Sequence, residues 1–191
     1  MNKAAEPAYS LKDIQGFRQR SDIVKLLKPG AIGVELGVAE GKFSETLLKT
    51  GYFTHLYSID MWAGDRNHDT KEYKIALSRL LSFREINTTL RMKFDEALEL
   101  FPDAFFDFIY VDGYAHTGEE GGATFENWWP KLKPGGIMAG DDYSPKWPLV
   151  IKAVDTFIAN YHLEMAVLDF QKSDDRWSQY PSWVTVKPLE N

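Results

Sequence analysis

The chain has 191 residues, a formal net charge of −6 and no cysteine. This length and a hydrophobic content of 44% suit one domain with a three-layer α/β core. The negative charge argues against nucleic acid as the main partner, and the lack of cysteine excludes disulfides, thiolate nucleophiles and thiolate zinc sites. Apolar runs are too short to span a bilayer and residues 1–10 lack the apolar core of a signal peptide, so we expect a cytoplasmic protein.

Strand and helix patterns alternate along the chain, which predicts a parallel sheet with helices on both faces. We expect a single domain over residues 1–191 that begins with a helical segment over residues 1–28. The last two strands can pair as an antiparallel hairpin. In chain order, the predicted elements are a helix over 10–27, a strand over 31–36, a helix over 42–50, a strand over 55–59, a helix over 71–83, a strand over 87–92, a helix over 96–101, a strand over 106–112, a helix over 124–132, a strand over 136–139, a helix over 150–161 and strands over 164–169 and 183–186.

A glycine turn joins the first predicted strand to the next helix, over residues 34–41. Gly37 and Gly41 lack a Cβ, which lets the backbone approach a ligand closely. This turn therefore predicts a cradle for a nucleotide-like cofactor. The dinucleotide-binding fingerprint needs further glycines where this chain has Ala39 and Lys42, so an NAD-dependent oxidoreductase is disfavoured.

Two acids accompany the turn. Glu35 lies two residues before Gly37, where it can bind the ammonium group of an amino acid or a nearby water. Asp60 ends the second predicted strand, where it can accept hydrogen bonds from both hydroxyls of a ribose. The alternative is a tight strand-to-helix turn with an ordinary, exposed Asp60.

Three further acids follow two predicted strands: Asp112 ends the fourth, and Asp141 and Asp142 follow the fifth. Ligands of an open parallel sheet bind outside the carboxyl ends of its strands, so we expect these acids to converge. Carboxylates that converge repel each other unless they share protons or bind a cation, and oxygen ligands suit Mg²⁺. The alternative is that Asp112 is an exposed strand end and that the other two acids cap the following helix.

The order of these motifs resembles that of the class I S-adenosylmethionine-dependent methyltransferases. The matching motifs lie between residues 30 and 143 and are Glu35-x-Gly37-x-x-x-Gly41, Asp60, Phe94-Asp95-Glu96-Ala97, Tyr110-Val111-Asp112-Gly113 and Leu132-Lys133-Pro134-Gly135-Gly136. The resemblance implies an α/β, Rossmann-like three-layer sandwich with a seven-stranded, mostly parallel sheet of order 3-2-1-4-5-7-6 and an antiparallel strand 7. It also implies S-adenosylmethionine as the cofactor, bound by Glu35, Gly37, Gly41, Asp60, Met61, Trp62, Phe94, Asp95, Glu96 and Asp112.

The acids also resemble those of small-molecule O-methyltransferases that bind Mg²⁺ after strands four and five. Residues 128–143 are similar to the branch of macrolide- and aminocoumarin-sugar methyltransferases and cephalosporin-hydroxylase-like proteins. This resemblance implies a Mg²⁺ ion bound by Asp112, Asp141 and Asp142. It also implies Mg²⁺-assisted O-methylation of a small hydroxylated molecule, such as a sugar, a diol or another natural product.

The general base of such a reaction is either His116 or Asp112. Relatives often have histidine three residues after the first aspartate, where this chain has Ala115, with His116 one residue later. Two alternatives stay open: a metal-independent methyltransferase and a cofactor-binding, hydroxylase-like relative. We expect a small-molecule substrate and neither a nucleic-acid nor a membrane partner, and we allow for a homodimer.

The remaining expectations concern loops and tryptophans. Loops over residues 61–69, 113–122 and 144–149 are expected to cover the site and to select the acceptor. Trp62 and Trp147 lie in these loops and are candidates for substrate contact. Trp128 and Trp129 lie on a predicted helix and are expected in the core instead.

Overall fold

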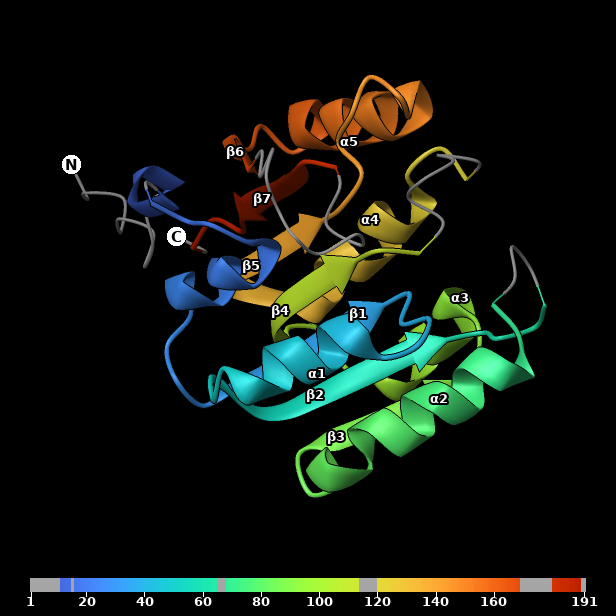
Figure 1. Cartoon of the computed structure of the whole chain (residues 1–191). Helices are drawn as coiled ribbons and strands as arrows, with labels where there is room; N and C mark the ends of the chain where they lie inside the picture. The colour runs from blue at the N-terminus through green and yellow to red at the C-terminus, as the bar shows by residue number, and fades with distance from the viewer. Residues whose placement is uncertain (1–10, 15, 65–67, 114–119, 169–179, 190–191) are drawn as a thin grey trace.

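The computed structural model describes residues 11–14, 16–64, 68–113, 120–168 and 180–189. Its strands are β1 (Ala31–Leu36), β2 (Phe53–Asp60), β3 (Asn87–Arg91), β4 (Phe106–Val111), β5 (Leu132–Gly140), β6 (Met165–Leu168) and β7 (Ser182–Val186). They form one seven-stranded sheet of order β3-β2-β1-β4-β5-β7-β6 (Figure 1). Neighbouring strands are parallel, except that β7 runs antiparallel to β5 and to β6. The predicted strand order and the antiparallel strand 7 are confirmed.

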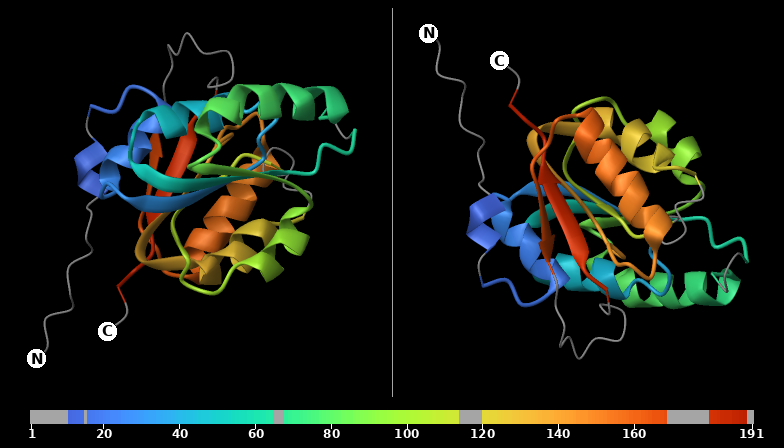
Figure 2. Two further views of the ribbon diagram at one scale, coloured as in Figure 1. Left: turned by 90° about the horizontal axis from the view of Figure 1, so that it is seen from below. Right: turned by 90° about the horizontal axis from the view of Figure 1, so that it is seen from above.

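Helices cover both faces of this sheet. The α-helices are α1 (Lys42–Lys49), α2 (Thr70–Leu80), α3 (Phe94–Ala97), α4 (Ala123–Trp128) and α5 (Pro148–Asn160). The 3₁₀ helices are η1 (Leu11–Ile14), η2 (Arg20–Leu26), η3 (Leu81–Phe83), η4 (Leu98–Leu100) and η6 (Trp129–Lys131). Figure 2 shows α1 and α2 on one face of the sheet and α3, α4 and α5 on the other, which is the predicted three-layer arrangement.

Two buried apolar clusters fill the spaces between the sheet and its helical layers. The first joins the sheet to α3, α4 and α5 and includes Trp128 and Trp129, which are 0% and 6% exposed. The second joins the sheet to η2 and α1 and includes Ile23, Leu47 and Phe108. The expectation that both tryptophans belong to the core is confirmed.

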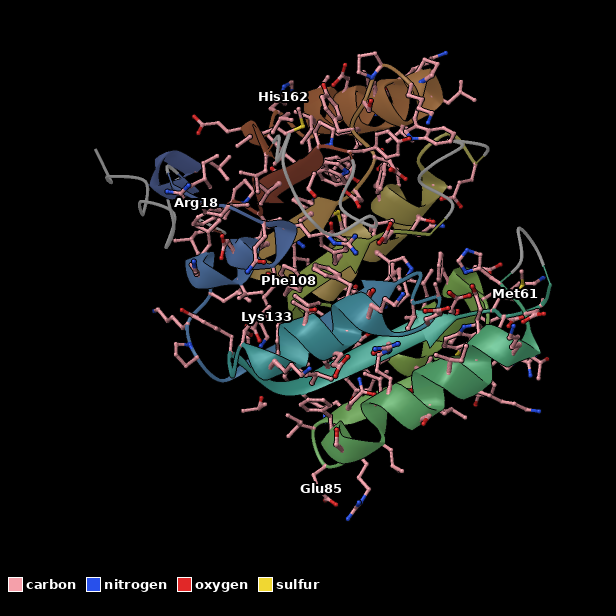
Figure 3. All side chains as sticks on the ribbon, in the orientation of Figure 1. Arg18, Met61, Glu85, Phe108, Lys133 and His162 are labelled. Carbon is pink, nitrogen blue, oxygen red and sulfur yellow. The ribbon has the colours of Figure 1, made fainter. Side chains whose placement is uncertain are left out.

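The N-terminal segment differs from the single helix predicted over residues 10–27. Among the residues that the structure describes there, it has two 3₁₀ helices, η1 and η2, because Gly16 adopts a φ of +99°, which interrupts a right-handed helix. The carboxylate of Asp22 then accepts hydrogen bonds from the backbone nitrogens of Arg18 and Gln19, at 2.7 and 3.2 Å, and so satisfies donors at the start of η2. Figure 3 labels Arg18, which lies just before η2. As a result, Arg20 begins η2 as a buried residue.

β5 begins earlier than the strand predicted over residues 136–139. The residues before that strand form a bulge within β5, since Phe106 pairs with Leu132 but Phe108 pairs with Ile137. Gly135 lies in this bulge and has a φ of +76°. Among the residues described, the structure has no helix with the length and apolar character needed to cross a membrane.

Candidate active site

A cavity of about 300 Å³ lies at the carboxyl ends of β1, β4 and β5. This is the edge at which ligands of an open α/β sheet bind, and the volume falls within the range of small-molecule sites. One side of the cavity is formed by residues 37–40 of the glycine turn. Its remaining lining residues are Arg20, Glu35, Lys42, Phe43, His68, Asp112, Asp141, Asp142, Trp147 and Tyr180. The structure thus brings the predicted turn and the predicted acids together.

The glycine turn lies very close to the end of β4. Gly37 has a φ of +98°, and a Cβ on it would lie 2.5 Å from the backbone nitrogen of Gly113 and 2.6 Å from the carbonyl carbon of Asp112. The absence of a side chain at Gly37 is therefore required by the chain itself as well as by any ligand. Gly41 does not line the cavity; it begins α1 with a φ of +76°, and a Cβ there would lie 3.3 Å from Cα of Ala76 in α2.

Asp60 holds the glycine turn through hydrogen bonds. Its Oδ2 accepts from the backbone nitrogens of Val38 and Ala39, at 2.9 and 3.0 Å, and its Oδ1 accepts from that of Trp62 at 3.1 Å. It is 8% exposed, so the alternative of an ordinary, exposed Asp60 is wrong. Each carboxylate oxygen can accept more than one hydrogen bond, so these contacts leave capacity for hydroxyl groups. His68, which lines the cavity, lies near Asp60, with its Nδ1 3.9 Å from Oδ2.

Trp62 supports the turn from the side of α2. Its ring is 1% exposed and packs with Val38, Ala76 and Tyr73, and its Nε1 donates to the carbonyl oxygen of Ala39 at 2.9 Å. The expectation that Trp62 contacts the cofactor or a substrate is therefore corrected, because the ring is enclosed between the turn and α2. Met61 is half-buried beyond the end of β2 (Figure 3) and keeps its position at the predicted cofactor edge.

The predicted cofactor-binding residues Phe94, Asp95 and Glu96 lie at the start of α3. Phe94 is 8% exposed and belongs to the core cluster beneath α3, while Asp95 and Glu96 are exposed. The carboxylate of Glu96 accepts from the backbone nitrogen of Lys93 at 3.2 Å, so it caps the helix. None of these three predicted residues lines the cavity.

Glu35 is a fully buried acid at the cavity wall, 1% exposed. The hydroxyl of Ser44 donates to its Oε2 and lies 2.8 Å from that of Ser58, which in turn accepts from the side-chain nitrogen of Asn87 at 2.9 Å. Burial raises the pKa of Glu35 to about 8, against the opposing effect of the Ser44 hydrogen bond. Glu35 is therefore largely protonated near neutral pH.

The acids at the ends of β4 and β5 are joined by Arg20. Its Nη1 donates to Oδ2 of Asp112 and to Oδ2 of Asp141, both at 2.9 Å. The hydroxyl of Ser182 donates to Oδ1 of Asp141 at 3.0 Å, and Asp142 is 6% exposed next to it. The convergence of the acids is as predicted, and the alternative of an exposed, unpartnered Asp112 is wrong.

Burial governs the protonation of this cluster. Burial raises the pKa of Asp141 to about 8, and the charges of Asp112 and Asp142 add to the rise, while Arg20 opposes it. Burial alone would lower the pKa of Arg20, but the neighbouring acidic groups raise it above its ordinary value. The guanidinium therefore stays charged, and it is the fixed positive charge among these acids.

The contacts of Arg20 bear directly on the predicted Mg²⁺ site. Nη1 lies between Asp112 and Asp141, where the cation was expected, and Ser182 binds the other oxygen of Asp141. Within the described part of the chain, no group of three or more histidine, aspartate or glutamate side chains is arranged to hold a metal ion. The residues present therefore do not fit Mg²⁺, and this expectation is corrected on the chemistry of the donor set.

Several lining residues were not predicted as site residues, notably Arg20, Lys42, Phe43, His68 and Tyr180. Arg20 belongs to a segment whose apolar spacing predicts only a helix, and nothing in that spacing indicates that it reaches the ligand edge. Trp147 lines the cavity, as expected for a substrate-contact residue. The predicted base His116 lies outside the residues that the structure describes, and its role stays a prediction.

Residues 34–143 match the family described as "Methyltransferase domain". The chain belongs to this family, and its strand order is the one that the resemblance to class I S-adenosylmethionine-dependent methyltransferases implies. Over 127 residues, 63% of this chain, it is 30% identical to the uncharacterized protein y4gI of Sinorhizobium fredii (strain NBRC 101917 / NGR234). The chain spans only 14% of the length of that relative.

Solved structures with a similar fold include methyltransferases and spermidine synthases. The N-methyltransferase NodS from Bradyrhizobium japonicum WM9 has a TM-score of 0.63 and 18% identity, covering 88% of this chain and 91% of its own. An O-methyltransferase from Bacillus cereus in complex with SAH has a TM-score of 0.64 and 15% identity, covering 87% of this chain and 78% of its own. At these identities the likeness concerns the fold alone.

Proposed function

We propose that this enzyme transfers the methyl group of S-adenosylmethionine to a hydroxyl oxygen of a small molecule. The observation that carries the proposal is the shared cavity: backbone of the glycine turn forms one side of it, and Asp112 forms part of the other. A donor held at the turn then faces an acceptor held at the acids. Such alignment supplies much of the catalysis of a methyl transfer, because it replaces a bimolecular encounter.

The turn and Asp60 are our candidates for the cofactor side of the site. Residues 37–40 would hold the methionine end of S-adenosylmethionine, and Asp60 would accept ribose hydroxyls through its remaining lone pairs. Met61, which follows Asp60, would lie beside the adenine ring. Phe94, Asp95 and Glu96 are not part of this proposal, because Phe94 belongs to the core cluster and the two acids accept hydrogen bonds from backbone nitrogens at the start of α3.

Asp112 is our candidate for the general base. Its side chain is 21% exposed, whereas that of Asp141, the other acid bound to Arg20, is 4% exposed. Asp112 would take the proton of the acceptor hydroxyl while the oxygen forms a bond to the methyl carbon. The bond from that carbon to sulfur breaks at the same time, and its electron pair goes to sulfur. A positioned base of this kind contributes typically ~10²- to 10⁴-fold to the rate.

The charges in the cavity support a neutral hydroxyl rather than a protonated amine as the acceptor. The lining contains the cations Arg20 and Lys42 and five acids. Two of these acids, Glu35 and Asp141, hold their protons near pH 7 because their pKa values are raised to about 8. We further propose a small-molecule acceptor, such as a sugar or a diol, rather than nucleic acid.

The test begins with calorimetric titration of S-adenosylmethionine into the protein. Transfer to sugars, vicinal diols and catechols, and to amines of matched shape, is then measured as release of S-adenosylhomocysteine. We expect cofactor binding and turnover of a hydroxyl acceptor but not of its amine counterpart. Failure to bind the cofactor would contradict the proposal, and turnover of amines alone would replace it by N-methylation.

Asp112→Asn is the matching variant, because the amide keeps the shape of the side chain and loses its basicity. We expect kcat to fall roughly 10²-fold or more. Asp103→Asn serves as the control, since Asp103 is 72% exposed and pairs with Lys131. An unchanged kcat in Asp112→Asn would remove Asp112 as the base and leave His116 as the candidate.

A further inference from the structure

Arg20 is a charged side chain buried at the active site but outside the segment that the methyltransferase family matches. The match begins at residue 34, whereas Arg20 belongs to η2. Arg20 is 6% exposed, and its Cζ lies 4.0 Å from the ring centroid of Phe43. Burial of a guanidinium is unfavourable unless its charge is paired and its donors are bound. The position of Arg20 therefore calls for a role that the family motifs do not assign.

The pairing of Arg20 is asymmetric with respect to the cavity. Nη1 donates to one oxygen of Asp112 and one oxygen of Asp141, each at 2.9 Å. Asp141 is the inner acid, and Ser182 donates to its other oxygen at 3.0 Å. Asp112 is the outer acid, with a fivefold larger exposed fraction of 21% against 4%. Asp141 thus anchors Arg20, and Arg20 fixes the carboxylate of Asp112 at the cavity wall.

One nitrogen of Arg20 is left without a partner. Nε is buried and has no hydrogen-bond acceptor among the residues that the structure describes. A buried N–H donor without an acceptor is unfavourable. The two hydrogen bonds of Nη1 therefore hold Arg20 at the cavity wall although another of its donors stays unpaired.

We infer that Arg20 is the built-in cation of this active site and takes the place between Asp112 and Asp141 that a divalent metal ion would otherwise occupy. It is a positioning residue, which donates to both acids and holds Asp112 toward the acceptor hydroxyl. The inference rests on the proposed function, because it assigns Arg20 to the same methyl transfer. Methyl transfer by this enzyme then needs no added divalent metal.

The first experiment measures Mn²⁺ binding from the electron paramagnetic resonance signal of the free ion, without cofactor or acceptor. Arg20→Ala is compared with the wild type and with Lys25→Ala. Lys25 is a matched control, because it lies on the same helix, is 56% exposed and pairs with Asp22, and neither of these two residues lines the cavity. We expect Arg20→Ala to bind Mn²⁺, because its uncovered carboxylates suit a hard cation, and the other two proteins to bind none.

The second experiment measures methyl transfer in the presence of a chelator. We expect wild-type turnover to be unchanged by the chelator. Arg20→Ala should lower kcat roughly 10- to 100-fold, as is typical when a partner that orients a functional group is lost. KM for S-adenosylmethionine should change much less, and added guanidinium ion should restore part of kcat. The kcat of Arg20→Lys should be lower than that of Arg20→Ala with added guanidinium ion, since an ammonium group lacks the planar, forked donors of a guanidinium.

Stoichiometric Mn²⁺ binding by the wild type, or loss of its turnover in chelator, would overturn the inference in favour of a resident metal. Wild-type turnover in Arg20→Ala would overturn it as well. If circular dichroism shows that Arg20→Ala does not fold, the two wild-type measurements still decide between a metal and Arg20. Failure to methylate any hydroxyl would contradict the proposed function instead, and the Mn²⁺ measurement would still test Arg20.

Discussion

Replacing Gly37 by alanine tests how closely the glycine turn must approach the end of β4. The new Cβ would lie 2.5 Å from the backbone nitrogen of Gly113 and 2.6 Å from its Cα. Both are backbone atoms, which cannot rotate out of the way as a flexible side chain can. The substitution therefore moves the turn away from Asp112 and also strains its own backbone, since φ at Gly37 is +98°.

Two contributions set the expected loss of stability. Left-handed backbone costs a residue with a Cβ roughly 1–2 kcal/mol relative to glycine. Relief of an overlap inside a packed region typically costs roughly 1–3 kcal/mol. The sum is roughly 2–5 kcal/mol, and for a domain of this size each kcal/mol lowers Tm by roughly 2–4 °C. We therefore expect Tm to fall by roughly 4–20 °C.

Gly30→Ala is a matched control for this measurement. Gly30 has a φ of +96°, and no described atom lies within 4 Å of the position of its Cβ, so alanine there adds backbone strain without overlap. Urea unfolding followed by circular dichroism compares the two variants. We expect Gly30→Ala to lose only the backbone contribution and Gly37→Ala to lose both, together with methyl transfer. Equal losses in the two variants would refute the close approach of the turn to β4.

Three further substitutions test neighbouring residues. Asp60→Asn should weaken S-adenosylmethionine binding roughly tenfold or more in calorimetry, and unchanged affinity would remove Asp60 from the ribose site. Trp62→Phe removes the hydrogen bond to the carbonyl of Ala39 and should lower the free energy of unfolding in urea by roughly 1 kcal/mol. An unchanged free energy of unfolding would contradict this prediction. Because burial raises the pKa of Glu35 from 4.5 to about 8, the folded protein keeps a proton that the unfolded chain releases, so stability falls as pH rises from 4.5 to about 8. Glu35→Gln mimics the protonated acid and should flatten this dependence in urea unfolding, whereas an unchanged slope would contradict the raised pKa.

The sheet and the meeting of the turn with the acids could be predicted because both depend on local patterns. Short apolar runs that end in glycine or acidic residues define β1, β4 and β5. Parallel strands then bring Gly37, Asp112 and Asp141 to one edge of the sheet, whatever the details of the helical layers.

Features that depend on how helices lie on the sheet could not be predicted in this way. The ring of Trp62 is buried because α2 covers it, and hydrophobic spacing gives the faces of a helix but not its position. Arg20 reaches the acids because Gly16 interrupts the N-terminal segment and η2 packs against the second core cluster. The guanidinium of Arg20 therefore lies where the sequence predicted a metal ion, and no motif near Arg20 indicates this position.

The buried polar residues behind the glycine turn keep three strands in a single alignment. Glu35 of β1 pairs with Ser58 of β2, and Asn87 of β3 donates to the hydroxyl of Ser58 and to the carbonyl of Leu56. A slip of one residue between strands would turn these side chains to opposite faces and leave a carboxyl group buried without a donor. Apolar side chains tolerate such a slip better, because one branched residue can replace another. The polar residues therefore fix the register of the three strands, and this register places Asp60 at the end of β2 beside the turn that it holds.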